Sequence, residues 1–256
     1  MLSFRNSSII VLILITLNII LGGPVGVYWL IGMAYFSLLV WGSMRIDSQF
    51  YTRAICRAPS KHETSKKVAI SFDDGPMEEY TPQILDTLRQ FNAPAVFFCI
   101  GQRVEANARL AKRIVEEGHI IGNHSYTHHA LIDLYGTARL TRELADTNRA
   151  IEEATGKKPR YFRPPYGVTT PNLAKAIKNG AMTTIGWNLR SMDTVARSGE
   201  QLLEKLRKEV KPGAIVLLHD TMAVTASVLP RFIEALKEQG YEIVPIDQLI
   251  NEEAYA

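Results

Sequence analysis

Two acidic residues, Asp73 and Asp74, stand next to each other after an apolar run and before Gly75 and Pro76. Alone, this string is most typical of a turn in which an Asp caps the following helix. The chemical interpretation divides the work between the carboxylates: one binds a cation while the other, held nearby, acts as a base. The string by itself does not decide between the two.

Two histidines, His124 and His128, lie four residues apart, with His129 adjacent. On its own, such a pair is as typical of a surface or a helix cap as of a metal site. Together with a carboxylate from another segment, it completes a set of two imidazoles and one carboxylate that leaves positions open for water or substrate. A Zn²⁺ ion held there would lower the pKa of bound water toward about 7 and polarise a carbonyl group.

A rigid turn is predicted at 163–167, where the sequence reads Arg-Pro-Pro-Tyr-Gly. One interpretation stops there. In the other, the prolines hold the backbone stiff, so that an N–H group of the turn can stabilise an oxyanion. Arg163 is permanently charged and bidentate, which lets it hold a carboxylate in one orientation.

His219 follows Leu217 and Leu218 at the end of another apolar run. It is either a core histidine followed by a helix-capping Asp220 or a general acid at the edge of a site. Cleavage of an amide needs such an acid, because an amide anion is a very poor leaving group. A carboxylate such as Asp193 would keep the imidazole protonated.

The elements that must position these residues are apolar runs of strand length that alternate with amphipathic stretches of helical period. The predicted strands are 68–72, 95–100, 119–122, 160–163, 183–187, 214–218 and 241–246. The predicted helices are 81–91, 102–117, 137–155, 171–179, 199–210 and 226–239. Continuous apolar strands separated by helices indicate a parallel sheet that is covered by helices on its outer face.

Seven strands in about 195 residues predict an α/β domain with a deformed (β/α)7 barrel. In barrels of this kind the chemistry gathers at the C-terminal ends of the strands. Each polar candidate falls at or just after such an end: Asp73, Asp74, His124, Arg163, Asp193 and His219.

The N-terminal part has a different composition, since residues 6–44 contain no Asp, Glu, Lys, Arg or His. At about 1.5 Å per residue, one helix of this length would be roughly 58 Å long, about twice the thickness of a bilayer core. Residues 22–26 read Gly-Gly-Pro-Val-Gly and break the stretch. We therefore predict a transmembrane helical hairpin with spans near 7–22 and 26–43. The alternative is a cleaved signal peptide followed by one span.

The expected organisation is a membrane anchor at 1–44, a basic juxtamembrane linker at 45–63 and a catalytic domain at 64–256. Six Lys and Arg residues oppose one Asp and one Glu between Arg45 and Lys67, a net charge of +4 within a chain of +3. This charge suits anionic lipid headgroups and not a nucleic acid. The positive-inside rule places both ends of the hairpin in the cytoplasm.

Four segments follow one another along the chain: FDDGP at 72–76, HSYTH at 124–128, RPPYG at 163–167 and LLH at 217–219. They resemble four motifs of the polysaccharide deacetylase family, also called the NodB-homology or carbohydrate esterase 4 family. The resemblance covers about residues 64–250. It implies a hydrolase of carbon–nitrogen bonds other than peptide bonds, which removes N-acetyl groups from glycans such as peptidoglycan or chitin oligomers and releases acetate.

The resemblance also implies roles for individual residues. Asp74, His124 and His128 would bind one divalent ion, Zn²⁺ in the first place, with Co²⁺, Ni²⁺ or Mn²⁺ as alternatives. Asp73 would be the base that activates the metal-bound water, and Arg163 would orient Asp73.

On the leaving-group side, the resemblance assigns the backbone N–H of Tyr166 to the oxyanion. His219 would protonate the departing amine, with Asp193 as its partner. Leu217 would line the pocket for the acetyl methyl group.

One further family motif is altered. The family pattern has an Asp three residues after a Trp, and then a second Asp followed by a Trp. This chain keeps Trp187 and Asp193 but has Arg190 and Thr194 in place of the first Asp and the second Trp. We expect Trp187 and Arg190 to contact the substrate, and we expect the preference to shift toward an anionic or lipid-linked glycan.

Two other functions stay open at this point. One is a metal-free amidase or imidase on the same fold, against which the presence of both His124 and His128 argues. The other is a catalytically impaired, membrane-tethered glycan-binding protein. The side of the membrane is also open, since polysaccharides usually lie outside the cell whereas the charge rule favours a cytoplasmic domain. A lipid-linked sugar at the membrane face would suit a cytoplasmic domain.

Overall fold

The sheet is built from apolar runs that are buried on both faces, as expected for parallel strands covered by helices. The protein is described here by a computed structural model, at residues 2–59 and 66–256. Within these residues the strands are β1 (Ala54–Ile55), β2 (Lys67–Asp73), β3 (Ala95–Cys99), β4 (Ile120–Asn123), β5 (Tyr161–Phe162), β6 (Thr183–Ile185), β7 (Leu189–Arg190), β8 (Ile215–His219) and β9 (Glu242–Ile243). They pair in parallel in the order β1-β6-β5-β4-β3-β2-β8-β7, and β9 pairs with β2.

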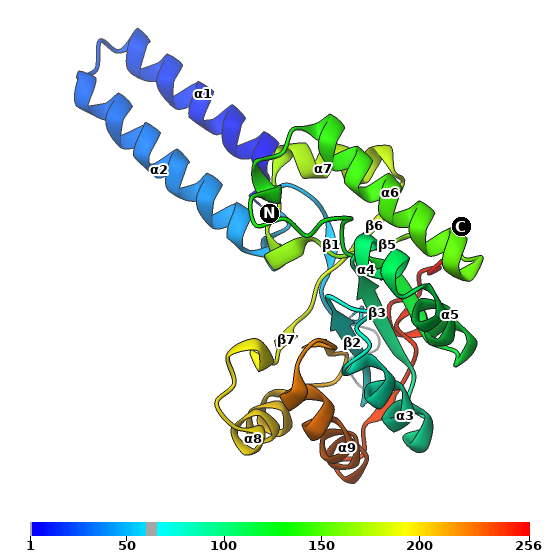
Figure 1. Ribbon diagram of the computed structural model, residues 1–256. Helices are drawn as coiled ribbons and strands as arrows, with labels where there is room; N and C mark the ends of the chain where they lie inside the picture. Colours follow the sequence, from blue (N-terminus) through cyan, green and yellow to red (C-terminus); the bar gives the residue numbers. More distant parts are fainter. Residues whose placement is uncertain (1, 60–65) are drawn as a thin grey trace.

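Helices surround the outer face of this sheet (Figure 1). The helices of the described chain are α1 (Phe4–Ile20), α2 (Val25–Met44), α3 (Thr81–Phe91), α4 (Gly101–Ala106), α5 (Ala108–Glu116), α6 (Thr137–Thr155), α7 (Pro171–Asn179), α8 (Gly199–Glu209), α9 (Ala223–Glu238) and α10 (Ile246–Ile250). The main core lies between the outer face of the sheet and α3, α5, α8 and α9. A second core fills the inside of the curled sheet and includes α10.

Strand β2 shows how the fold separates core from chemistry. Its side chains alternate between the two faces of the sheet, because a strand has a period of two residues. Ile70 and Phe72 belong to the core under the helices, whereas Ala69 belongs to the inner core. The same alternation turns Ser71 and Asp73 toward the inner face of the sheet. Asp73 is the last residue of the strand.

The predicted strands are present, and so are the predicted helices except the one at 102–117. The sheet is curled and open, since its order ends at β1 and β7. This architecture is consistent with a deformed (β/α)7 barrel. The short strands β1 and β7 were not predicted, because two residues carry no periodicity. The single helix predicted at 102–117 is wrong: it is divided into α4 and α5 at Asn107, which has a non-helical φ of −128°.

Helices α1 and α2 lie side by side and extend away from the sheet (Figure 1). Ser8 Oγ and Tyr35 Oη are 2.7 Å apart, and large apolar side chains such as Leu12 and Phe36 are more than half exposed. Helix α2, with 20 residues, is long and apolar enough to cross a bilayer; α1 is apolar but has 17 residues. That both helices span a membrane stays a prediction.

Residues 45–59, the described part of the predicted linker, pack against the domain. Strand β1 extends the sheet beyond β6, and the backbone N–H of Ala58 donates to the carbonyl of Gly213 at 2.9 Å. Arg57 forms an antiparallel bridge with Ala214 at the start of β8. The segment therefore contributes to the sheet. The predicted boundary at 63–64 lies outside the described residues.

Candidate active site

Arg163, which directly follows β5, is fully buried at the centre of the site. Its Nη1 donates hydrogen bonds to Asp73 Oδ1 at 2.7 Å and to Ser71 Oγ at 2.8 Å. Its Nη2 and Nε donate to the carbonyl groups of Gly186 and Ile185 at 2.9 and 3.3 Å. Burial lowers the pKa of Arg163, an effect that the charge of Asp73 opposes, and an arginine stays protonated in proteins. These bonds fix both the guanidinium and the Asp73 carboxylate.

The backbone of Arg163 also fixes His124. The Arg163 carbonyl oxygen lies 2.8 Å from His124 Nδ1. With its proton on Nδ1, a neutral His124 has an unprotonated Nε2. This Nε2 lies 3.4 Å from Asp74 Oδ1, and His128 Nε2 lies at the same distance from that oxygen. The three ligand atoms lie within 4.8 Å of one another.

This donor set fits a divalent cation. In a tetrahedral Zn²⁺ site, ligand atoms about 2.0–2.2 Å from the ion lie about 3.4 Å from each other. Burial would raise the pKa of Asp74, but His124, His128 and His219 lower it below its ordinary value. Burial lowers the pKa of His128 to about 4, so this imidazole is neutral and able to coordinate at neutral pH. The pKa of His124 is raised, because the charge of Asp73 and its contact with Asp74 outweigh burial.

Glu143, on α6, holds the loop between the two histidines and was not predicted as a site residue. Its buried carboxylate accepts hydrogen bonds from the backbone N–H groups of Tyr126 and Thr127 at 3.0 and 2.8 Å, and from Thr127 Oγ1 at 3.0 Å. A signal existed in the sequence: Glu143 lies on the apolar stripe of the helix, between Leu140 and Leu144, where an acidic residue needs a partner.

Four residues of the site adopt the left-handed backbone conformation that side chains other than glycine rarely take. They are Asp74 (φ 78°), Ser125 (φ 66°), His128 (φ 48°) and Tyr166 (φ 58°). Such conformations cost about 1–3 kcal/mol each and persist where the surroundings enforce them. Their concentration in three separate loops marks this end of the sheet as the functional one.

His219 and Asp193 form a second pair on the opposite side of Asp73. His219 lies beside Asp73 in the register of β8 and β2. Its Nδ1 is 2.7 Å from Asp193 Oδ1, and its backbone N–H donates to Asp193 Oδ2 at 2.7 Å. Thr225 Oγ1 donates to the same Oδ2 at 2.6 Å. Burial lowers the pKa of His219, but the hydrogen bond and charge of Asp193 outweigh it and raise the pKa to about 9. The imidazole is thus protonated at neutral pH.

Asp220 is not the cap of the following helix, whose N-cap is Met222. It is fully buried, and its Oδ2 accepts a hydrogen bond from Thr81 Oγ1 at 2.7 Å. A Cβ atom on Gly75 would meet this Oδ2 at 1.9 Å, so the turn after Asp74 requires a glycine here. Burial raises the pKa of Asp220 to about 7. Nothing in the sequence indicated this buried carboxyl group.

The remaining predicted residues line the rim. Leu217 is buried on the inner face of β8 in register with Ser71, two residues before His219. The Tyr166 ring is half exposed and lies 4.8 Å from the His128 ring between centroids. Trp187 and Arg190 form the adjacent wall, with the Arg190 side chain exposed on β7.

Comparison with known proteins identifies the family of this site. The model of the family described as polysaccharide deacetylase matches residues 60–185. A peptidoglycan N-acetylglucosamine deacetylase of Bacillus cereus is 38% identical over 198 residues, which cover 72% of this chain and 88% of the relative. The chain belongs to the polysaccharide deacetylase family. The resemblance drawn from the four motifs is confirmed.

Other polysaccharide deacetylases differ in length and in activity. A peptidoglycan N-acetylglucosamine deacetylase of Listeria monocytogenes is 38% identical over 192 residues, which cover 75% of this chain and 40% of the relative. The chain thus spans two fifths of that relative's length. The crystal structure of a CE4 family pseudoenzyme from Bacillus anthracis has a TM-score of 0.71 at 35% identity, covering 77% of this chain and 68% of that one. Membership of the family therefore does not by itself establish activity.

Proposed function

We propose that the protein is a metal-dependent deacetylase that hydrolyses the acetamido groups of an amino-sugar glycan and releases acetate. The observation that carries the proposal is the convergence of three groups: a set of cation ligands at Asp74, His124 and His128, a carboxylate fixed beside it, and a protonated imidazole across from that carboxylate. Metal-assisted hydrolysis of an amide uses these three functions together.

Asp73 is the proposed base. Its Oδ1 is engaged by Arg163, while its Oδ2 lies 3.8 Å from His124 Nε2, on the side of the ligand set. Held in this way, the carboxylate accepts a proton from a water molecule as the water oxygen attacks the acetamide carbonyl carbon. A bound divalent ion would supply Lewis acidity, polarising the carbonyl group and lowering the pKa of water.

The proposed oxyanion donor is the backbone N–H of Tyr166, in the stiff turn after Pro164 and Pro165. His219 is the proposed acid: it donates its proton to the nitrogen as the carbon–nitrogen bond breaks, so that a neutral amine leaves and acetate remains. Asp193 stabilises the imidazolium before this transfer. The proposed site for the acetyl methyl group is the apolar surface of Leu217.

We also propose that Zn²⁺ is the native ion, that residues 1–44 anchor the protein in a membrane, and that residues 64–256 carry the catalysis. Two imidazoles and one carboxylate suit Zn²⁺, although Co²⁺, Ni²⁺ and Mn²⁺ accept the same ligands. The exposed apolar surfaces of α1 and α2 support the anchor.

A pseudoenzyme is the second candidate, because the altered segment with Arg190 and Thr194 lies on the acid side and a structural relative is a pseudoenzyme. Acetate release by the detergent-solubilised full chain from peptidoglycan and chitin oligomers separates the two. We expect equal amounts of acetate and free amine from the natural chain and almost none from Asp73→Asn. The matched control is Asp86→Asn, a surface carboxylate that pairs with Arg89. A natural chain no faster than Asp73→Asn would favour the pseudoenzyme.

A further inference from the structure

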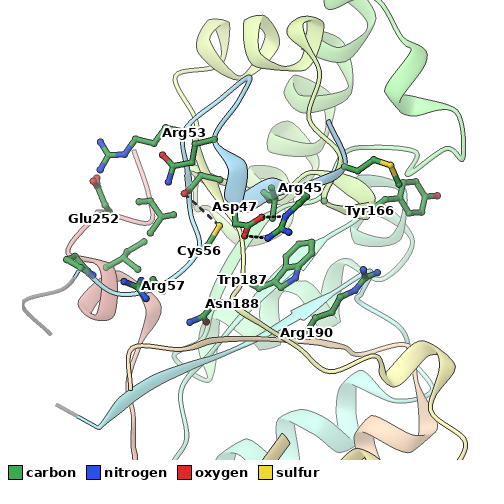
Figure 2. A pocket seen from close by; sticks show the side chains of 18 of the residues that line it. Arg45, Asp47, Arg53, Cys56, Arg57, Tyr166, Trp187, Asn188, Arg190 and Glu252 are labelled. Carbon is green, nitrogen blue, oxygen red and sulfur yellow. Dashed lines mark hydrogen bonds and ion pairs between the residues drawn. The ribbon is translucent and has the colours of Figure 1, made fainter. Parts of the chain in front are cut away.

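A cavity of about 840 Å³ lies between the segment that follows α2 and the rim of the site (Figure 2). Residues 44–59 line one side, and the other side includes residues of the loops after β5 and β6 and of β7. Arg53 and Arg57 lie toward one end, whereas Tyr166 and Arg190 lie toward the other (Figure 2). The cavity thus extends from the rim of the site, which lies beside the end of α2, toward Arg53 and Arg57.

Cations outnumber carboxylates in this lining by five to two, a formal excess of three positive charges. The cations are Arg45, Arg53, Arg57, Arg190 and Lys211, and the carboxylates are Asp47 and Glu252. A cleft with charge of one sign concentrates ligands of the opposite sign. Guanidinium groups bind phosphate oxygens in a bidentate manner. The lining therefore suits a phosphate or diphosphate group.

One end of the cavity adjoins the proposed chemistry. The Tyr166 ring, in the lining, lies 4.8 Å from the ring of the ligand His128. The Trp187 ring lies between the two ends of the cavity (Figure 2) and presents a flat surface to a sugar. The cations line the cavity from Arg190 at this end to Arg53 and Arg57 at the other, so a diphosphate bound along it would point a directly attached sugar toward the ligand set.

The end of an apolar helix lies beside the Tyr166 end of the cavity. Met44, the last residue of α2, lines the cavity. Two hydrogen bonds hold this end on the domain, from the backbone N–H of Thr169 to the carbonyl of Ser43 at 3.0 Å and from Ser43 Oγ to the carbonyl of Thr169 at 2.7 Å. If α2 spans the bilayer, the cavity opens at the depth of the phospholipid headgroups, where the phosphate of a lipid-linked sugar lies.

We propose that this cavity binds the phosphate or diphosphate of a lipid-linked acetamido sugar and presents the sugar to the site, while the lipid chain continues into the bilayer that α2 would span. This inference names the substrate class of the site and rests on the proposed function. It also assigns a task to Arg190, which replaces an acidic residue of the family pattern with a cation in the lining of the cavity.

The first test compares two substrates with the full chain in phosphatidylcholine nanodiscs: polyprenyl-diphosphate N-acetylglucosamine in the bilayer and neutral tri-N-acetylchitotriose in solution. We expect the double variant Arg53→Ala/Lys211→Ala to lower the ratio of kcat/KM for the lipid substrate to that for the neutral one about tenfold or more, since bonds to charged groups are lost. The matched control, Lys112→Ala/Arg149→Ala, removes two exposed cations from α5 and α6 and should keep the natural ratio. An equal change for both substrates would overturn the proposal.

The second test measures binding without turnover, which keeps the inference separable from the proposed function. Asp73→Asn protein in nanodiscs should retain the radiolabelled polyprenyl-diphosphate sugar, and Arg53→Ala/Lys211→Ala added to it should weaken retention about tenfold.

Excess phosphatidylglycerol or UDP-N-acetylglucosamine should displace the ligand poorly. Displacement by phosphatidylglycerol at equal concentration would mean that the cavity is a general site for anionic lipids. Stronger binding of UDP-N-acetylglucosamine than of the lipid-linked sugar would exclude the lipid linkage. Either result would overturn the proposal. If Asp73→Asn protein retains the lipid-linked sugar but the natural chain releases no acetate, the result would count against the catalytic proposal alone.

Discussion

The two sides of the site differ in the residues that adjoin them. On the metal side, the ligand loops are fixed by buried charges that each make several hydrogen bonds, Arg163 to four acceptors and Glu143 to three donors. On the acid side, Asp193 is likewise buried and hydrogen-bonded to both His219 and Thr225, but the nearby positions 190 and 194 are exposed. We therefore expect both proposed sides to tolerate little change in their buried charges, and substrate preference to vary at the exposed positions 190 and 194.

Loss of a metal ligand should have the largest effect. His128→Ala removes one of three donors, and we expect acetate release to fall about a thousandfold or more, because the cation supplies several kcal/mol of transition-state stabilisation. Metal content per chain, measured on the same sample by mass spectrometry, should fall with it. His129→Ala is the matched control, since His129 is adjacent and exposed. Full activity in His128→Ala would show that hydrolysis does not depend on a metal ion held by His128.

Loss of Asp193 should act on the pH dependence. With the His219 pKa raised to about 9, the acid form is present below that pH and is lost as the pH rises through it. A bound cation nearby lowers this value somewhat. Asp193→Asn removes the stabilising charge, so the alkaline limb of kcat/KM should move about one to two pH units lower, with a loss of about a hundredfold at pH 8. An unchanged limb would show that His219 is not the acid.

Loss of the Glu143 charge should be milder and confined to the metal side. Glu143→Gln keeps the shape but places an amide NH₂ among the N–H groups of Tyr126 and Thr127. We expect metal affinity to fall about 10- to 100-fold, as for other residues that orient ligands, with activity restored at high metal concentration. Glu153→Gln on the same helix is the control. Unaltered metal affinity, measured by competition with a chelator, would argue against this positioning role.

The smallest effect is expected at Arg190. Arg190→Asp restores the usual acidic residue of the family motif and reverses the charge at the rim. We expect a change below about tenfold in the preference between anionic and neutral acetylated glycans, in favour of the neutral ones, because the side chain is exposed and its charge is screened. An unchanged substrate profile across a glycan panel would mean that the altered motif does not set preference.

The parts of this architecture that repeat were visible in the sequence. Strands such as 68–72 are continuous apolar runs and helices such as 137–155 have a helical period. The motif residues fall at strand ends, where a parallel sheet gathers them. What could not be predicted is set by tertiary contacts. Strand β1 has two residues and exists because β6 offers an edge; Asp220 looked like a helix cap but is buried against Thr81.

The proposed hydrolysis depends on one ion at Asp74, His124 and His128. The direct measurement is acetate release from N-acetylglucosamine oligomers by the full chain, after removal of metal with a chelator and stepwise addition of Zn²⁺, with bound metal counted at each step. We expect activity to disappear on chelation and to return in proportion to metal occupancy, reaching its maximum at one ion per chain. Undiminished acetate release from protein shown to hold no metal would contradict it.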